Sequence, residues 1–196
     1  MKTIIEATLN DSIAVKRRFI ADSTSTIIII AQRIADAMVS GHKVLLFGNG
    51  GSAADAQHIA AEFVNRFVIE RPPLAAIALT TDTSILTSIG NDYSFEEIFS
   101  KQIRALGRKD DVAVGISTSG NSPNVIAGMA AAAELGMTSI GFSGAKGRLP
   151  EVSDICLKVA SATTARIQEC HILAAHITCD LVDRILFPKA YVEGRA

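Results

Sequence analysis

The 196-residue sequence contains no tryptophan, and aromatic residues make up only 5 % of it. The core must therefore be built mainly from aliphatic side chains, because hydrophobic residues of all kinds still account for 48 % of the chain. No apolar run reaches the roughly 20 residues that a membrane-spanning helix needs. The N-terminus lacks the apolar segment of a secretory signal. We therefore expect a cytoplasmic protein that does not associate with membranes.

Neither sign of charge dominates, since 19 basic residues stand against 20 acidic ones. They are scattered along the chain, so direct nucleic-acid binding has little electrostatic support. Cys156, Cys170 and Cys179 lack the paired CxxC spacing of a zinc cluster, and we expect small buried side chains in a reducing compartment. The mean hydropathy of +0.31 is high for a monomer and indicates apolar surface that other subunits cover.

From residue 43 onward, short apolar runs alternate with helical stretches. Apolar strands that alternate with helices are typical of a parallel sheet with helices on both faces. The pattern predicts strands at 44–47, 75–79, 112–116, 139–142 and 155–159, and helices at 53–67, 83–89, 95–106, 123–135 and 165–187.

The N-terminal part of the chain predicts two helices, at residues 3–21 and 24–40, that form a helical hairpin. The second is apolar almost all round, which is typical of a helix buried on several sides. We expect a single α/β domain over residues 1–196, with a five-stranded parallel sheet that helices cover on both faces. Residues 43–187 would form its α/β core, and residues 1–40 would serve oligomerisation.

A glycine-rich segment at residues 48–52, here called the glycine loop, joins the first predicted strand to a helix. Such loops present backbone N–H groups to an anion at the helix N-terminus. The segment also matches the pattern G-x-G-x-x-A through Gly48, Gly50 and Ala53. A dinucleotide fold expects an acidic residue at the end of the second strand, but Glu70 at that spacing precedes the strand. Dinucleotide binding is therefore not favoured.

His58 and Glu62 follow the glycine loop with i, i+4 spacing, which places an imidazole and a carboxylate on one helix face. Asp55 and Asn65 share that face. An ordinary solvated face would carry similar residues. The adjoining glycine loop and a second set of polar residues in the last helix favour a site, which another element must cover to keep dry.

A run of hydroxyl side chains at residues 117–122, here called the hydroxyl loop, follows the third predicted strand. A single helix cap would explain Ser122. It would not explain Ser117, Thr118 and Ser119 together at the carboxyl end of a strand. Because hydroxyl and N–H groups bind phosphate without lysine, we favour a neutral phosphate site here.

The last predicted helix carries Gln168 and His176. Histidines on a largely apolar helix are most often hydrogen-bonded core residues. The two residues are eight positions apart, which corresponds to about 12 Å of rise and about 80° of rotation. One straight helix could hardly bring both side chains to one atom. If both serve one site, either the helix begins irregularly at Gln168 or the two residues come from different subunits.

Together these motifs resemble the sedoheptulose 7-phosphate isomerase (phosphoheptose isomerase) family of the sugar isomerase (SIS) domain fold. The resemblance covers nearly the whole chain, to about Phe187. It rests on residues 48–58, Glu62, residues 90–92, residues 117–122, residues 166–169 and His176.

The resemblance implies an isomerase that converts sedoheptulose 7-phosphate into a glycero-manno-heptose 7-phosphate for cell-surface glycans such as lipopolysaccharide. It implies a homotetramer with sites shared between subunits and one zinc ion per subunit. The family's zinc ligands would fall on His58, Glu62, Gln168 and His176. Its substrate contacts would fall on Asn49, Gly50, Gly51, Ser52, Glu62, Asn91, Asp92, Ser117, Thr118, Ser119, Ser122 and Gln168.

Aldose–ketose exchange needs a proton moved between neighbouring carbons through an enediol, together with a group that handles the two oxygens. Glu62 and His176 are our candidates for this catalytic pair. The alternative function is a non-catalytic SIS-domain scaffold that binds the bacterial replication initiator DnaA. Scaffolds of that kind resemble the family but lack the catalytic carboxylate and the final histidine, both of which this chain retains. Some family members have an acid where this chain has Ala165, so contacts to the substrate hydroxyls are expected to differ there.

Overall fold

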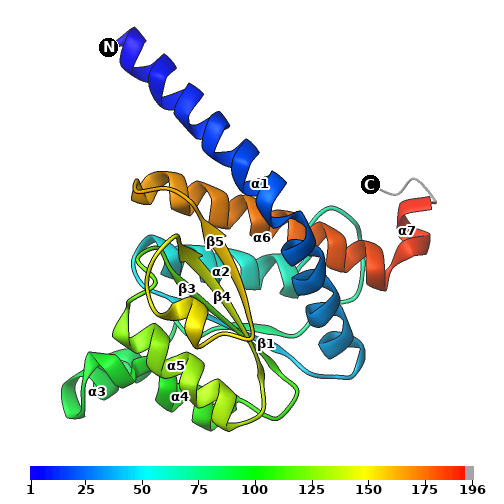
Figure 1. Cartoon of the computed structure of the whole chain (residues 1–196). Helices are drawn as coiled ribbons and strands as arrows, with labels where there is room; N and C mark the ends of the chain where they lie inside the picture. The colour runs from blue at the N-terminus through cyan, green and yellow to red at the C-terminus, as the bar shows by residue number, and fades with distance from the viewer. Residues whose placement is uncertain (193–196) are drawn as a thin grey trace.

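The structure, a computed structural model, describes residues 1–192 and is built around one sheet of parallel strands (Figure 1). The strand order is β2-β1-β3-β4-β5, and every pairing is parallel. The strands are β1 (Val44–Gly48), β2 (Ala76–Ala78), β3 (Val112–Ser117), β4 (Thr138–Gly144) and β5 (Ile155–Val159). Each predicted strand is confirmed, with its ends shifted by at most two residues.

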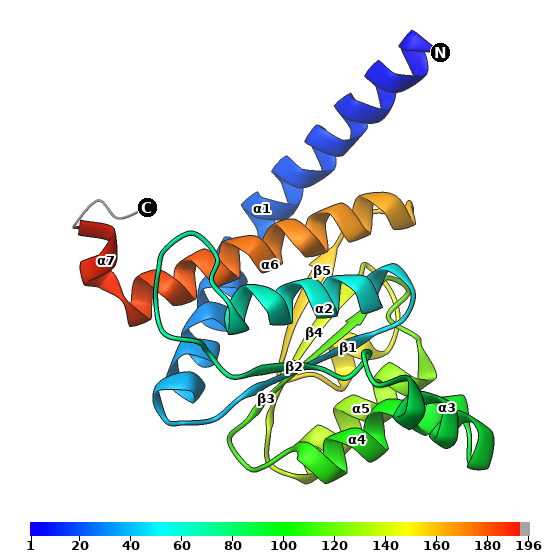
Figure 2. The same cartoon turned by 180° about the vertical axis from the view of Figure 1, so that it is seen from behind.

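Helices cover both faces of the sheet, as the sequence predicts. One layer contains α1, α2 and α6, and the other contains α3, α4 and α5 (Figures 1 and 2). Their bounds are α1 (Lys2–Val39), α2 (Gly51–Val64), α3 (Thr83–Asp92), α4 (Ile98–Leu106), α5 (Pro123–Glu134) and α6 (Thr164–Leu186). Shorter elements are the 3₁₀ turns η1 (Phe95–Glu97) and η2 (Leu149–Glu151), and the C-terminal α7 (Pro188–Val192). The helix predicted at 95–106 is thus divided into η1 and α4.

The core has two halves because side chains alternate between the faces of each strand. Leu46 of β1 packs toward the layer of α1, α2 and α6. Its neighbours Leu45 and Phe47 pack toward the layer of α3, α4 and α5. All of β1 and β3 is buried, which is the pattern of central strands covered on both sides.

The predicted N-terminal helical hairpin is wrong, because α1 is one continuous helix of 38 residues. The polar segment at the expected break contains neither proline nor glycine. Ser23 is buried there, and the hydroxyl of Thr24 donates a hydrogen bond to the carbonyl of Ile20 at 2.7 Å within the helix. The first part of α1 projects away from the sheet, while the second part packs beside α6 (Figure 1).

The cysteines agree with the expectation of isolated thiols. All three are free, with Cys170 and Cys179 buried and Cys156 partly buried, and burial raises the pKa of the Cys156 thiol to about 11. Among residues 1–192, no helix combines the length and the apolar character that crossing a membrane requires.

The topology predicts a ligand-binding crevice at the carboxyl ends of β1 and β3. The chain passes from β1 to β2 on one side and then to β3 on the other, so the strand order switches between β1 and β3. Ligands of open parallel sheets bind in the crevice at such a switch point. The glycine loop follows β1 and the hydroxyl loop follows β3, so the two predicted binding loops flank this crevice.

Candidate active site

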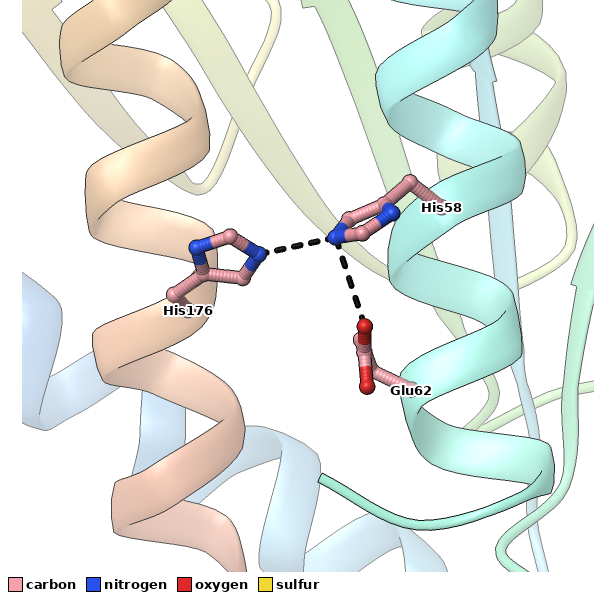
Figure 3. Close-up of side chains that lie close together, drawn as sticks. All are labelled: His58, Glu62 and His176. Atoms are coloured by element: carbon pink, nitrogen blue, oxygen red, sulfur yellow. Dashed lines mark hydrogen bonds and ion pairs between the residues drawn. The ribbon is translucent and has the colours of Figure 1, made fainter. Parts of the chain in front are cut away.

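His58, Glu62 and His176 form a compact cluster between α2 and α6 (Figure 3). The Nε2 atoms of the two histidines are 2.8 Å apart, and the Nε2 of His58 lies 3.3 Å from Oε1 of Glu62. One ligand atom from each of the three residues lies within 4.8 Å of the others. Helix α6 of the same chain therefore brings His176 against the polar face predicted for α2, where the side chain of His58 stays 49 % exposed.

An aromatic contact holds His176 in place. The ring of Phe67 stacks on the imidazole of His176, with ring centroids 5.5 Å apart. The sequence places Phe67 on a predicted helix of 53–67, but α2 ends at Val64 and Phe67 lies in the segment beyond it. Phe67, beyond the end of α2, is thus a direct neighbour of the site.

Asp55 is a fourth ionisable group beside this cluster. It precedes His58 by about one turn of α2 and is partly buried. Burial raises the pKa of the Asp55 carboxyl above its ordinary value, and the charges of nearby His58 and His176 oppose that rise. Asp55 was visible as part of the polar face, but nothing in the sequence gave it a role.

The donor set of the cluster fits a divalent zinc ion. Two imidazole nitrogens and one carboxylate are common zinc ligands, and three protein ligands with an open position are typical of catalytic sites. Ligand atoms on a tetrahedral zinc ion lie about 3.4 Å apart, since each bond is about 2.1 Å long. The separation of 3.3 Å between His58 and Glu62 is close to that value, whereas the 2.8 Å between the two histidines is shorter and would have to widen around an ion.

The hydroxyl loop is a connected group of serines. The hydroxyl of Ser117 lies 2.9 Å from that of Ser122 and 3.4 Å from that of Ser119. Thr118 and Ser119 also line a pocket of about 480 Å³. The other residues lining this pocket are Gly144, Ala145, Lys146, Ala160, Ser161, Ala162, Thr164 and Ile167. The loop therefore offers several hydroxyl groups beside an open cavity, as a phosphate site requires.

His171, the other histidine of α6, lies outside the cluster. His171 is 1 % exposed, and its Nε2–H donates a hydrogen bond to the carbonyl of Ser143 at 3.2 Å. Burial lowers the pKa of His171 to about 4, so the ring is neutral near pH 7. His171 is thus a core histidine, whereas His176 belongs to the site.

The glycine loop is tied to α5 through a pair of amides. The amide of Asn49 donates to Oδ1 of Asn124 at 2.8 Å, and the amide of Asn124 donates back at 2.9 Å. Gly50 has φ of +55°, a conformation that favours glycine. Ser52 is buried, and its N–H donates to the carbonyl of Asn49 at 3.0 Å. The side chain of Asn49 and the backbone N–H of Ser52 thus shape the loop, and the sequence gave no signal for Asn124.

Gln168 lies beside Gly51, where its amide fills the space that a Cβ at position 51 would occupy. It belongs to the regular helix α6, which begins at Thr164, so an irregular helix start at Gln168 is excluded. Within one chain, Gln168 is therefore placed at the glycine loop, about 12 Å along the helix axis from His176.

Asn91 and Asp92 lie at the exposed end of α3. The amide of Asn91 donates to Oδ1 of Asp92 at 2.8 Å. Within residues 1–192, no hydrogen bond or ion pair joins either side chain to another predicted site residue. The single chain does not bring these two residues to the cluster.

Fold and site together define a SIS-domain protein, a parallel α/β sheet with polar loops at its carboxyl edge. The family model described as SIS domain matches residues 9–144. A phosphoheptose isomerase of Roseiflexus sp. is 58 % identical over 179 residues, which cover 91 % of each chain.

Solved structures agree with the sequence relatives. A phosphoheptose isomerase from Neisseria gonorrhoeae is 46 % identical with a TM-score of 0.88, over 93 % of this chain and 98 % of that one. Another from Francisella tularensis is 39 % identical with a TM-score of 0.90, over 93 % of this chain and 97 % of that one. The chain belongs to the phosphoheptose isomerase family.

Proposed function

We propose that this enzyme converts sedoheptulose 7-phosphate into D-glycero-D-manno-heptose 7-phosphate, the first step of heptose biosynthesis for cell-surface glycans. The observation that carries the proposal is the convergence of His58, Glu62 and His176 between α2 and α6, in a chain whose strand β3 also ends in the hydroxyl loop. One part can move protons, while the other is suited to hold a phosphate.

The isomerisation transfers two protons. One leaves C1 of the ketose and returns at C2, and the other moves from the C1 hydroxyl to the former carbonyl oxygen, through an enediol. Glu62 and His176 are the pair we assign to these transfers, since carboxylate and imidazole side chains are the commonest general acids and bases. His58 lies between them, with its Nε2 at 2.8 Å from Nε2 of His176 and at 3.3 Å from Oε1 of Glu62.

The hydroxyl loop would hold the phosphate through Ser117, Thr118, Ser119 and Ser122. The glycine loop would approach the sugar through Asn49, Gly50, Gly51 and Ser52, with Gln168 beside it. Because Asn91 and Asp92 lie apart from the cluster within one chain, their role as substrate contacts depends on a neighbouring subunit.

Zinc is the metal we propose, one ion per subunit, held by His58, Glu62 and His176, with Gln168 as a fourth ligand from a neighbouring subunit. When bound, zinc would polarise the substrate carbonyl and stabilise negative charge on the enediol oxygens. A carboxylate that ligates a metal is a weaker base. Glu62 would therefore alternate between holding the metal and transferring a proton.

Turnover of sedoheptulose 7-phosphate is the direct test. We expect the purified enzyme to form an aldose phosphate, and prolonged dialysis against a chelator to lower the rate at least about tenfold, because outer contacts alone change metal-site activity by 10- to 100-fold. Added zinc should restore the rate. Absence of an aldose product with and without zinc would contradict the proposed function.

A homotetramer with shared sites is the assembly we propose, with α1 as the main contact. Apolar side chains recur every four residues along the projecting part of α1, at Ile5, Leu9 and Ile13, and are 69 %, 57 % and 40 % exposed. A stripe of this kind on a free helix is typical of a helix that packs against other subunits.

Replacing Leu9 with aspartate should therefore dissociate the assembly, because a charge would be buried in the contact. Light scattering coupled to size-exclusion chromatography would measure the mass. Ala7→Asp, on an exposed residue about 160° around the same helix from Leu9, serves as a control and should leave the mass unchanged. A tetramer that survives Leu9→Asp would move the contact away from this stripe.

The DnaA-binding scaffold is not favoured, because the carboxylate and histidine that such scaffolds lack are both present and lie in one cluster. The cellular location remains a prediction from the sequence.

A further inference from the structure

A buried ion pair lies just beyond the catalytic cluster. Arg71, in the segment after α2, directs its Nε–H to Oδ1 of Asp183 on α6 at 2.8 Å. The side chain of Arg71 is 1 % exposed and that of Asp183 is 0 % exposed. Burial raises the pKa of the Asp183 carboxyl, and the adjacent guanidinium opposes that rise.

The two terminal nitrogens of the guanidinium group donate hydrogen bonds to the end of α2. One terminal nitrogen of Arg71 donates to the carbonyl of Glu62 at 2.7 Å, and the other donates to the carbonyl of Phe63 at 2.6 Å. The last carbonyls of a helix have no partner within it, and a cation at this end is favoured by the helix dipole. Arg71 thus fixes the final turn of α2, in which Glu62 lies.

Asp183 occupies the matching place on α6. It lies about two turns beyond His176, and this spacing returns a side chain to nearly the same face of a helix. One face of α6 therefore presents His176 to His58 and Asp183 to Arg71. The same two helices carry both the catalytic pair and the ion pair.

We propose that Arg71 and Asp183 are positioning residues, which set the distance between Glu62 and His176. This inference rests on the proposed function, in which Glu62 and His176 are the catalytic pair. The planar fork of arginine contacts one carboxylate and the helix-end carbonyls at once, whereas the ammonium of lysine acts as a point charge. Neither residue touches the reacting atoms, so both act through the backbone of Glu62 and through α6.

The orphaned oxygen of the pair supports a positional role. Among the described residues, Oδ2 of Asp183 has no hydrogen-bond partner. A buried carboxylate with one unsatisfied oxygen is costly to the fold, and buried ion pairs are often no more stabilising than apolar replacements. We therefore infer that the Arg71–Asp183 pair fixes the position of α2 relative to α6 and lowers the stability of the fold in doing so.

Two variants and one matched pair test this inference. Arg71→Lys keeps the charge but loses the fork, and Asp183→Asn keeps the shape but loses the charge. We expect kcat to fall about 10- to 100-fold, the scale for misplacing a reacting group by an ångström. The KM should stay within about twofold, because the hydroxyl loop on β3 is untouched.

The control is the Asp180–Arg184 pair, which lies on α6 with the same N···O distance of 2.8 Å but is far less buried, with side chains that are 30 % and 53 % exposed. Asp180→Asn and Arg184→Lys should leave kcat unchanged. Cobalt provides a second readout, since the absorption spectrum of bound Co²⁺ reports the geometry of the His58, Glu62 and His176 cluster. That spectrum should change in Arg71→Lys and Asp183→Asn but not in the controls.

The outcomes separate the two proposals. If the unaltered enzyme does not turn over the sugar phosphate, the proposed function fails, and the cobalt spectra still decide whether the pair sets the cluster geometry. Folded variants with unchanged kcat and unchanged spectra would overturn the positioning role. Loss of the folded state in both variants, measured by circular dichroism, would assign the pair to stability alone and also overturn it.

Discussion

Glu62→Gln is expected to lower kcat by about 100- to 10,000-fold, the range that general acid–base catalysis contributes. Glutamine keeps the shape of the side chain but neither accepts a proton nor carries the charge that balances a metal ion. Because Oε1 of Glu62 lies 3.3 Å from Nε2 of His58, the substitution acts at the centre of the cluster. The rate of aldose phosphate formation measures it.

The same variant should remain folded. The Glu62 side chain is 22 % exposed, and its carbonyl keeps the hydrogen bond from Arg71 because that bond involves the backbone. We expect the free energy of unfolding to change by less than about 1 kcal/mol, as for substitutions away from core contacts. Thermal denaturation checks this, and a large loss of stability would reassign Glu62 to the fold.

Glu70→Gln is the matched control, since Glu70 is 81 % exposed and pairs only with Arg66 on the surface among the described residues. It should keep the full rate. Excess zinc distinguishes the two roles of Glu62. A rate that zinc restores would show that the carboxylate serves the metal, whereas a rate that stays low would assign it to proton transfer.

Much of the fold could be predicted from the sequence because each strand is a short apolar run between helix signals. Local pattern was sufficient for β1 to β5 and for helices on both faces of the sheet. It failed at residues 22–24, where polar side chains that favour turns are accommodated inside α1. The burial of Ser23 shows that tertiary packing acts on that segment, and no local pattern records it.

The site was predictable only where local spacing defines it. The i, i+4 pair of His58 and Glu62 and the run of hydroxyls in residues 117–122 are visible in the sequence. Asn124, Arg71 and Asp183 were missed because each acts on a segment that is distant along the chain. Their partners are fixed by the packing of α5 and α6 against β1 and α2, which spacing alone cannot reveal.

Gly120→Ala is expected to raise the KM at least about tenfold, a loss of about 1.4 kcal/mol of binding. Gly120 has φ of +67°, where a Cβ is strained, and the space for that Cβ is taken by the carbonyl of Lys146 and the hydroxyl of Ser143. Its own carbonyl accepts a hydrogen bond from the N–H of Leu149 at 2.9 Å. The loop must therefore shift, which would move Ser119 away from the proposed phosphate position.

Stability should fall together with substrate binding in this variant. A left-handed conformation costs a residue other than glycine about 1–2 kcal/mol. Overpacking adds about 1–3 kcal/mol. Thermal or urea denaturation measures the sum, and steady-state kinetics with the sugar phosphate measures the KM.

Gly41→Ala separates these two causes. Gly41 has φ of +81°, but no heavy atom of the described residues outside its chain neighbours lies within 4 Å of the position of a Cβ there. The variant should lose only about 1–2 kcal/mol of stability from strain and keep its KM. If Gly120→Ala also kept its KM while losing stability, the hydroxyl loop would be a structural turn, and the phosphate would have to bind elsewhere. A raised KM in Gly120→Ala alone ties the phosphate to the backbone contact between the loops that follow β3 and β4.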